Sequence, residues 1–250
     1  MDAKEKIIEI FRRDVKGKKL AIKGSNPKHD GAKGHSLERL FGIKANGNNA
    51  PDLLGYELKS QTTNKTSFGD WSAGMYLFTG KGARCTRTEF IEMFGSPNPL
   101  KNNRYSWSGS CFPKVGVVNS FGQIMVVSDE GDVSIYYSYS NDIRPDKNEI
   151  IAREFQRDDL LLAKWPKEKL EKHVNRKFND KGWFKVFADD SGTCIELVFG
   201  KPMDFETWID LVRRGTIYLD SGMYVGNGRP YSNWRASNTF WDSLIVSRIS

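Results

Sequence analysis

The sequence predicts an α/β protein, organised as one unit with an inserted subdomain at about 85–150. Segments whose apolar residues recur with helical spacing alternate along the chain with segments of strand-like alternation. The region 115–140 holds short strand patterns separated by turns, which is typical of an antiparallel meander. No internal repeat or linker composition divides the 250 residues, so one packed chain is favoured.

The boundaries of these elements follow from the spacing of apolar residues and from the positions of glycine and proline. Apolar spacing predicts helices over 3–13, 35–42, 167–178 and 204–215. Gly42 and Gly215 end two of these helices, and Pro166 occupies the first turn of another. Alternating residues predict strands over 51–61, 73–80, 115–120, 123–129, 132–140, 183–190, 194–200 and 216–222. We expect the first two strands to pair with each other, and a last helix or strand to begin at about Asn238.

The charge balance points to an anionic partner. The chain has 38 Lys and Arg against 31 Asp and Glu, a net charge of +7. A basic surplus is expected of a protein that meets nucleic-acid phosphates, although solubility alone would also explain it. No stretch is long and apolar enough for a membrane helix, and the amino terminus lacks a signal-peptide core, so we expect a cytoplasmic protein.

Cysteine and histidine usage limits the kinds of metal site. The three cysteines, Cys85, Cys111 and Cys194, are odd in number and match neither a zinc spacing nor a disulfide framework. Only three histidines occur in the chain. A metal would therefore be held by oxygen ligands, which favours magnesium or manganese.

The segment 51–59, Pro-Asp-Leu-Leu-Gly-Tyr-Glu-Leu-Lys, carries the candidate chemistry. Side chains on a strand repeat every two residues, so Glu57 and Lys59 are expected on one face and Leu58 on the other. Asp52 precedes the strand across a turn at Gly55 and can fold back towards Glu57. Two carboxylates within roughly 5 Å repel by about 3 kcal/mol at an effective dielectric near 20, and a divalent cation relieves that repulsion. Asp52 and Glu57 are therefore the predicted ligands of Mg²⁺.

This arrangement suits phosphodiester hydrolysis. The cation would polarise the scissile phosphate, while Lys59 would orient the attacking water and stabilise the charge that develops. The alternative is an ordinary surface salt bridge between Glu57 and Lys59, because acid-x-lysine pairs arise by chance in many proteins.

The region around this segment resembles the MvaI/BcnI family of type II restriction endonucleases and, more loosely, the repair nickase MutH. The resemblance rests on the helix GHSLERLFG at 34–42 followed by APDLLGYELKSQ at 50–61, and on the strand MYLFTGKG at 75–82. Thr79 stands where some members carry a histidine, so no role of that histidine can be transferred. The similarity covers about 34–82 and 199–247.

The resemblance implies a restriction-endonuclease-like core, a mixed β-sheet flanked by helices, with an inserted or appended DNA-recognition subdomain. It implies magnesium-dependent cleavage of double-stranded DNA at a short, C/G-rich site by a monomer. It also puts Glu38 near the catalytic residues, although an exposed acid paired with Arg39 or Arg12 is the alternative. On this reading 1–84 and 160–200 form the catalytic part of a single nuclease chain, and 85–150 and 200–250 the recognition parts.

Three segments are candidates for DNA contact. Arginine can pair with guanine, asparagine with adenine, and aromatic rings can wedge against bases. The predicted loop 222–240 supplies Arg229, Tyr231, Asn233, Trp234 and Arg235, where the resemblance also puts recognition elements. The segment 98–111 supplies Lys101 and Arg104, and the lysine-rich stretch 16–33 supplies Lys18 and Lys19 as phosphate contacts. An ordinary surface loop or turn is the alternative for the first two segments, and a base-reading role is the alternative for the third.

Two other functions remain open from the sequence. One is a MutH-like enzyme that nicks DNA for repair, and the other is a DNA-binding module without catalysis. Dependence on magnesium separates the enzymes from the binding module.

Overall fold

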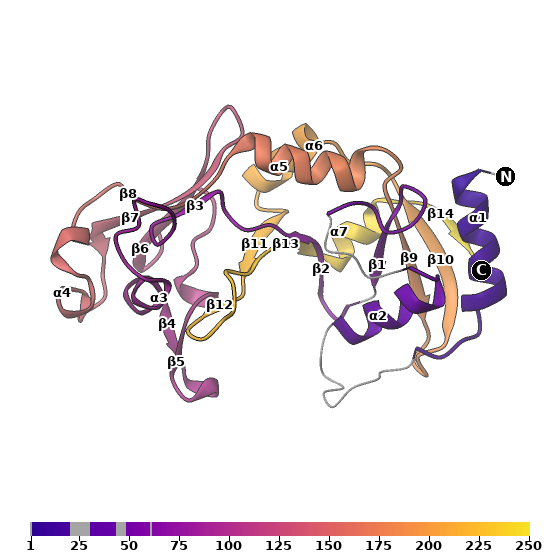
Figure 1. Cartoon of the computed structure of the whole chain (residues 1–250), viewed down its shortest axis with the longest axis horizontal. Helices are drawn as coiled ribbons and strands as arrows, with labels where there is room; N and C mark the ends of the chain where they lie inside the picture. The colour runs from indigo at the N-terminus through magenta and orange to yellow at the C-terminus, as the bar shows by residue number, and fades with distance from the viewer. Residues whose placement is uncertain (1, 21–30, 44–48, 61) are drawn as a thin grey trace. The chain divides into compact units, whose positions relative to one another are not determined.

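The chain separates into two compact units in a computed structural model that describes residues 2–20, 31–43, 49–60 and 62–250 (Figure 1). The first unit comprises Met1–Thr66, Lys172–Thr207 and Ala236–Ser250. The second comprises Ser67–Glu171 and Trp208–Arg235. Among the described helices, none has the length and apolar character needed to span a bilayer.

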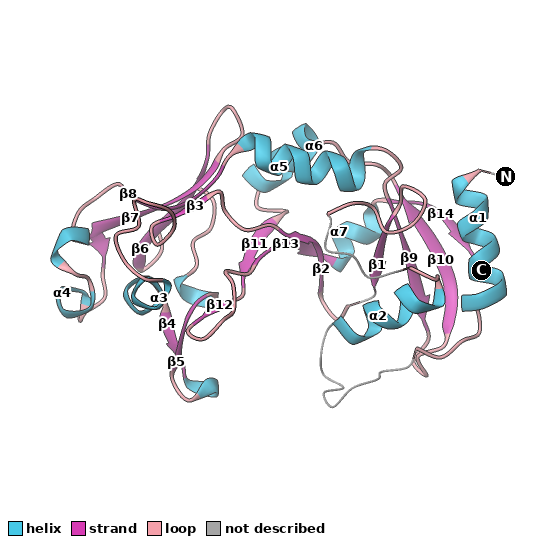
Figure 2. Cartoon of the chain, in the orientation of Figure 1, coloured by secondary structure: helices cyan, strands magenta, loops and turns pink. Residues whose placement is uncertain are grey.

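The first unit is built on a mixed four-stranded sheet in the order β1-β9-β10-β14 (Figure 2). Its strands are β1 (Glu57–Ser60), β9 (Trp183–Ala188), β10 (Cys194–Gly200) and β14 (Ile245–Ile249). Strand β1 runs parallel to β9, and β10 is antiparallel to both of its neighbours. The register places Lys59 opposite Lys185, so equivalent positions of β1 and β9 share a face.

Apolar helix faces cover one side of this sheet. Helix α1 (Ala3–Ile10), its π-helical continuation η1 (Phe11–Val15) and α2 (Gly31–Leu40) bury apolar residues against Leu58, Phe184 and Val186. An Asp2–Glu5 capping box begins α1. On the other side, Trp241 of α7 (Asn238–Ser243) packs edge-on against Trp183, with ring centroids 5.1 Å apart.

Helix α5 (Lys167–Val174) continues into the π-helical turn η5 (Asn175–Asn179), and α6 (Phe205–Arg213) follows β10 in the chain. Phe178 of η5 and Trp241 lie 6.1 Å apart on the side of the sheet opposite Leu58.

The second unit contains an antiparallel meander, β6 (Phe121–Val127), β7 (Val133–Asp142) and β8 (Leu160–Trp165), with β3 (Met75–Tyr76) added at the β8 edge. A smaller sheet has the order β12-β5-β4, from β4 (Ser96–Asn98), β5 (Arg104–Trp107) and β12 (Met223–Tyr224). The helices are α3 (Arg87–Phe94) and the short α4 (Lys147–Ile150), with 3₁₀ turns η2 (Pro99–Lys101), η3 (Gly109–Cys111) and η4 (Arg153–Phe155).

A third sheet, β11-β13-β2, covers a tryptophan core. Its strands are β2 (Lys65–Asp70), β11 (Tyr218–Ser221) and β13 (Ser232–Ser237). Trp234 of β13 lies 5.0 Å from Trp208 and 5.9 Å from Trp165 between ring centroids. Trp165 donates its indole N–H to the Trp71 backbone carbonyl, so this buried polar group is hydrogen-bonded within the core.

Most predicted elements are present, with shifted ends. The helices at 3–13, 167–178 and 204–215 and the strands at 183–190 and 194–200 are confirmed. The helix predicted at 35–42 begins earlier, at Gly31. The strand predicted at 51–61 is reduced to β1 because 53–56 forms a tight turn, and Gln61 lies outside the described residues. The segment 115–120 forms only isolated bridges, and β8 takes its place in the meander.

Two predictions were wrong in ways that matter for the site. Residues 73–80 do not pair with β1, because β3 pairs with β8 while β1 pairs with β9. The predicted loop 222–240 contains the regular strand β13. Strand alternation turns Trp234 into the core, where none of its surface is exposed, so it cannot read bases as predicted.

The unit boundaries also differ from those expected. The stretches 67–84 and 160–171 belong to the second unit, although the sequence assigned them to the catalytic part. The terminal stretch 236–250 belongs to the first unit, because β14 pairs with β10 as the last strand of its sheet and α7 packs on Trp183 of that sheet. Contacts between segments far apart in the sequence determine which unit each segment belongs to.

Replacing Trp234 by alanine tests its role as a core residue. We expect Trp234→Ala to lower the free energy of unfolding by about 3–5 kcal/mol, because a fully buried indole is removed from a packed cluster. Arg229→Ala, at an exposed ion pair, should change it by less than about 1 kcal/mol. Denaturant unfolding measures both; equal, small effects would contradict the burial of Trp234.

Candidate active site

A tight turn brings Asp52 to the start of β1. Leu53 and Tyr56 exchange two backbone hydrogen bonds, and the residues between them, Leu54 and Gly55, have φ angles of 51° and 87°. Positive φ at both central positions is the conformation of a type I′ turn, which glycine adopts without strain. Beyond the turn, the Asp52 carboxylate accepts a hydrogen bond of 2.9 Å from the Leu58 N–H. The fold-back predicted across Gly55 is therefore present.

Glu57 lies at the centre of a buried charge cluster. Its Oε1 accepts hydrogen bonds from Lys59 Nζ at 3.0 Å and from Lys177 Nζ at 2.8 Å. Only 3% of Glu57 and 7% of Lys59 is exposed. Glu57 and Lys59 share a face as the strand period predicts, and Leu58 between them joins the core. The pair is buried, which excludes the surface-salt-bridge alternative.

A third lysine, which is buried, extends the cluster on the neighbouring strand. Lys185 of β9 is opposite Lys59 in register, and its Nζ lies 3.2 Å from an Asp242 carboxylate oxygen of α7. The rings of Phe178 and Trp241 lie 5.0 and 5.6 Å from Lys59 Nζ, within cation–π range. Three lysines thus face three carboxylates, those of Asp52, Glu57 and Asp242.

Burial shifts the protonation equilibria of this cluster. Desolvation, together with the nearby Glu57 charge, raises the pKa of Asp52 to about 6. Burial acts to raise the pKa of Glu57 as well, but Lys59 and Lys177 outweigh it, so the pKa of Glu57 falls below its usual value. Burial also lowers the pKa of the Lys59 ammonium, against the opposing effect of Glu57. Glu57 is therefore ionised, while Asp52 carries a carboxyl group that gains a proton in mild acid.

The two carboxyl groups fit a hard divalent cation. Glu57 Oε2 is buried and has no hydrogen-bond partner among the described residues, so one ionised oxygen lacks compensation. Asp52 is close enough to Glu57 for their charges to interact. Mg²⁺ is commonly held by one or two carboxylates, with waters and substrate phosphates completing its shell. Within the described part of the chain, no group of three His, Cys, Asp or Glu side chains converges, so a cation here would have Asp52 and Glu57 as its side-chain donors.

Glu38 is not brought into this set. Its carboxylate lies 3.2 Å from the His35 ring nitrogen on the same helix, a local pair one turn apart. The predicted phosphate contacts Lys18 and Lys19 are exposed after η1, where backbone bonds to Cys194 and a bridge to Thr193 fix the chain. Residues 21–30 of the lysine-rich stretch lie outside the described residues.

The predicted base-reading residues lie in the second unit, on β13 and the segment before it. Arg235 is paired with Asp220 at 2.9 Å, and Arg229 with Asp70 at 2.6 Å. The Arg229 guanidinium also stacks 4.4 Å from the Tyr231 ring centroid. Asn233 accepts a long hydrogen bond, 3.5 Å, from Ser67. Asn233 and Arg235 are both partly exposed and share the face opposite Trp234.

The second predicted DNA segment has one ordered cation and one exposed cation. The Arg104 guanidinium lies 3.4 Å from the Tyr224 ring centroid, a stacked arrangement that fixes its plane. Lys101 is exposed in the 3₁₀ turn η2.

Sequence reasoning missed Lys177 and Lys185. Both carried a readable signal, because each lysine shares a helix or strand face with a buried apolar residue. Lys177 lies three residues after the buried Val174 on its helix, and Lys185 shares a face of β9 with the buried Trp183. A charged side chain is rarely buried unless it is paired with an opposite charge. Each of these lysines therefore indicated a buried acidic partner.

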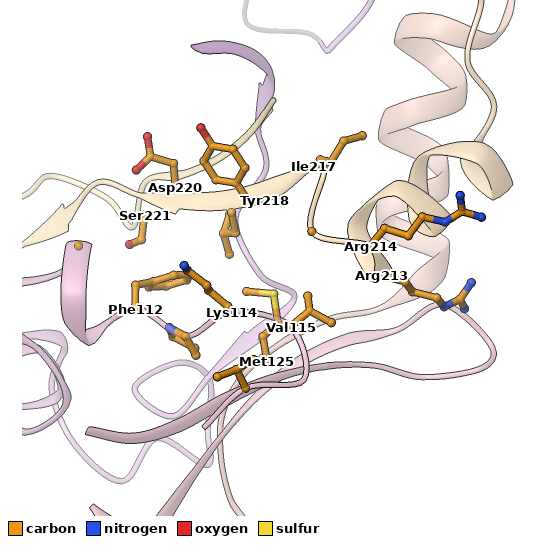
Figure 3. A pocket seen from close by; sticks show the side chains of 15 residues that line it. Phe112, Lys114, Val115, Met125, Arg213, Arg214, Ile217, Tyr218, Asp220 and Ser221 are labelled. Carbon is orange, nitrogen blue, oxygen red and sulfur yellow. The ribbon is translucent and has the colours of Figure 1, made fainter. Parts of the chain in front are cut away.

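A separate cavity of about 560 Å³ lies within the second unit (Figure 3). Phe112, Lys114, Val115 and Met125 face its interior, beneath β11. None of the predicted catalytic or DNA-reading residues lines it. The buried charge cluster of the first unit is therefore the better candidate for catalysis.

Comparison with known proteins agrees with this geometry. The family model described as LlaMI restriction endonuclease matches residues 15–249. The type II restriction enzyme ScrFI of Lactococcus lactis subsp. cremoris is 49% identical over 263 residues, which cover 97% of either chain. The solved structure titled restriction endonuclease MvaI-cognate DNA substrate complex superposes with a TM-score of 0.61 at 12% identity, covering 98% of this chain and 96% of that one. The last similarity concerns the fold.

The raised pKa of Asp52 predicts how stability depends on pH. A carboxyl whose pKa is about 6 when folded and 3.8 when unfolded binds its proton more tightly in the folded state. Its contribution is complete below pH 3.8 and is lost as pH rises through 6, at a cost of up to about 3 kcal/mol. Asp52→Asn should remove this loss and gain stability over the parent between pH 4 and 8.

Urea unfolding at pH 4 and at pH 8 measures this difference. The exposed Asp190→Asn serves as the control and should follow the parent at both values. If the stability gap between Asp52→Asn and the parent is the same at both pH values, Asp52 is not the buried acid described above.

Proposed function

The chain belongs to the LlaMI restriction endonuclease family and is a type II restriction enzyme, and from this premise we propose that Asp52, Glu57 and Lys59 carry its catalysis. The resemblance to MvaI is confirmed in the fold. The enzyme class replaces the two alternatives, a repair nickase and a binding module without catalysis. The residue roles rest on the geometry of the buried cluster.

One observation carries the assignment: a buried carboxylate with one oxygen held by two lysines and the other without a partner in the described chain. A purely structural ion pair would satisfy both oxygens, because an uncompensated buried charge is costly. The unsatisfied oxygen beside Asp52 therefore supports a ligand site, with Asp52 and Glu57 as the residues that would hold Mg²⁺.

The residues divide the chemistry between them. A cation held there would polarise the scissile phosphate and lower the pKa of an attacking water. Lys59 is fixed by Glu57 and by two aromatic rings, so its ammonium is positioned to stabilise charge on the phosphate without rearrangement. Leu58 anchors the strand that carries both groups. Glu38, which pairs with His35, is the weakest of the predicted catalytic residues, and we propose only an indirect role for it.

Substitution of Asp52 and Lys59 tests this assignment. Asp52→Ala should lower the rate of DNA cleavage at least about 10²-fold, because half of the metal donor set is lost, and Lys59→Ala by about 10²–10³-fold. Phage DNA incubated with Mg²⁺ should give discrete bands with the parent protein and with Asp190→Ala.

A readout without turnover accompanies the activity measurement. In the absence of DNA, MgCl₂ should raise the melting temperature of the parent at pH 8, because the cation neutralises buried carboxylates, and should leave Asp52→Ala unchanged. Full cleavage by Asp52→Ala would rule out the assignment of Asp52 as a metal ligand.

We also propose that the face of β13 that carries Asn233 and Arg235, with Arg229 and Tyr231 before it, contacts bases. Each arginine is oriented by one aspartate and keeps guanidinium donors for a second partner. Arginine forks recognise guanine, which suits the short C/G-rich site that the resemblance implies. The resemblance also implies that the enzyme acts as a monomer. Lys18, Lys19, Lys101 and Arg104 would contact phosphates or flank the site.

Arg235 and Lys18 offer a matched comparison of base and phosphate contacts. Arg235→Ala should cost about 1–3 kcal/mol in binding to the cognate site and relax discrimination there, whereas Lys18→Ala should weaken binding to all sequences equally. Lys18→Ala should also reduce the slope of log K against log salt by about 1. Competition binding at several salt concentrations, without Mg²⁺, measures both; equal weakening on all sequences by Arg235→Ala would remove it as a base reader.

A further inference from the structure

Lys177 is a second lysine that holds the same Glu57 carboxylate as Lys59. Its Nζ lies 2.8 Å from Glu57 Oε1, slightly nearer than the 3.0 Å of Lys59. Both ammonium groups therefore share one carboxylate oxygen, and Glu57 Oε2 has none of the described side chains as a hydrogen-bond partner. Lys59 alone suffices for the lysine role in the proposed catalysis, so the presence of Lys177 at the same carboxylate needs another explanation.

Charge balance shows that this second lysine competes with a divalent cation. The carboxylates of Asp52 and Glu57 offer at most two negative charges, and the ammonium groups of Lys59 and Lys177, at 3.0 and 2.8 Å from Glu57 Oε1, already match them. A cation of charge +2 added beside Glu57 would leave a buried excess of positive charge. Repulsion between like charges at such distances is large when solvent is excluded, so one ammonium must move or find a new anion.

Lys177 is the lysine that can move. The Lys59 side chain is 8% exposed and its ammonium lies within cation–π range of both Phe178 and Trp241, on a strand that is hydrogen-bonded to β9. The Lys177 side chain is twice as exposed, 16%, and belongs to the π-helical turn η5 at the end of its helix. Such π-helical turns occur often at functional sites because they re-aim the side chains they carry.

We propose that Lys177 is a positioning residue that holds Glu57 while the metal is absent and transfers its ammonium to a DNA phosphate when the cation binds. The phosphodiester is the anion that arrives with the substrate, and it supplies the negative charge that the crowded cluster lacks. No bond is made or broken in this exchange. The inference rests on the proposed role of Glu57 and Asp52 in binding the cation.

The variant Lys177→Met tests this with two readouts of opposite sign. Without DNA, isothermal titration with MgCl₂ should show affinity at least about tenfold higher than in the parent, because a competing positive charge is gone. With DNA and saturating Mg²⁺, kcat should fall about 10–100-fold, because the phosphate loses a charged contact. Lys177→Arg keeps the charge and should restore most of kcat, without the gain in Mg²⁺ affinity.

Lys172→Met is the matched control, since it removes one exposed lysine from the same helix. It should leave both Mg²⁺ affinity and kcat within about twofold of the parent. Circular dichroism and the melting temperature establish that each variant is folded; should Lys177→Met fail to fold, Lys177→Gln carries the same two expectations.

A Lys177→Met variant that binds Mg²⁺ no more tightly than the parent, or cleaves as fast, overturns the proposal. Weaker Mg²⁺ binding together with slower cleavage would mean that Lys177 only supports the structure of the site. Failure of the proposed function has a different signature, because Asp52→Ala would then retain Mg²⁺ binding and cleavage whatever Lys177 does.

Discussion

The burial of an ionised Glu57 carboxylate is the constraint on which the rest of the first unit depends. A charge removed from water is stable only where partners replace its hydration, and here two ammonium groups donate to one of its oxygens. One partner comes from the same strand and the other from η5, so the strand and the helix end cannot separate without exposing an unpaired charge. Lys185 and Asp242 repeat this arrangement between β9 and α7.

The two-residue period of a strand lets β1 serve the core and the site together. Leu58 enters the same apolar cluster as Phe184 and Val186, while Glu57, Lys59 and Lys185 face the opposite side. The apolar face fixes the register, because a shift by one residue would bury the charges among α1 and α2. The position of the charged side chains, Glu57, Lys59 and Lys185, is thus determined by hydrophobic packing on the opposite face of the sheet. This separation leaves the register to the apolar face and the link between β1 and η5 to the charged face.

Local rules predicted the parts of the site that lie close together in the sequence. The shared face of Glu57 and Lys59 follows from strand period, and the return of Asp52 follows from the turn at Gly55. Lys177, by contrast, is 120 positions from Glu57, and only the pairing of β1 with β9 brings its segment close. The inward direction of Trp234 was missed because glycines and polar residues around it suggested a loop. Its strand depends on partners in β11 and β2, which no local pattern specifies.

Without a cation or DNA, the acidic and basic groups of the cluster balance in charge, yet one carboxylate oxygen has no hydrogen-bond partner in the described chain. Glu57 Oε2 lacks a partner in the described chain, and Asp52 has a pKa of about 6 because burial and Glu57 both oppose its ionisation. A cation would relieve this repulsion and, in the same step, create a positive excess that an anionic phosphate relieves in turn. Under the proposed role of Asp52 and Glu57, the affinity for the metal and the affinity for DNA at this site are coupled, and linkage makes the coupling reciprocal. A nuclease that binds its cation as proposed would hold it most firmly when a phosphate is present, so the buried cluster itself would favour assembly of the complete site on DNA.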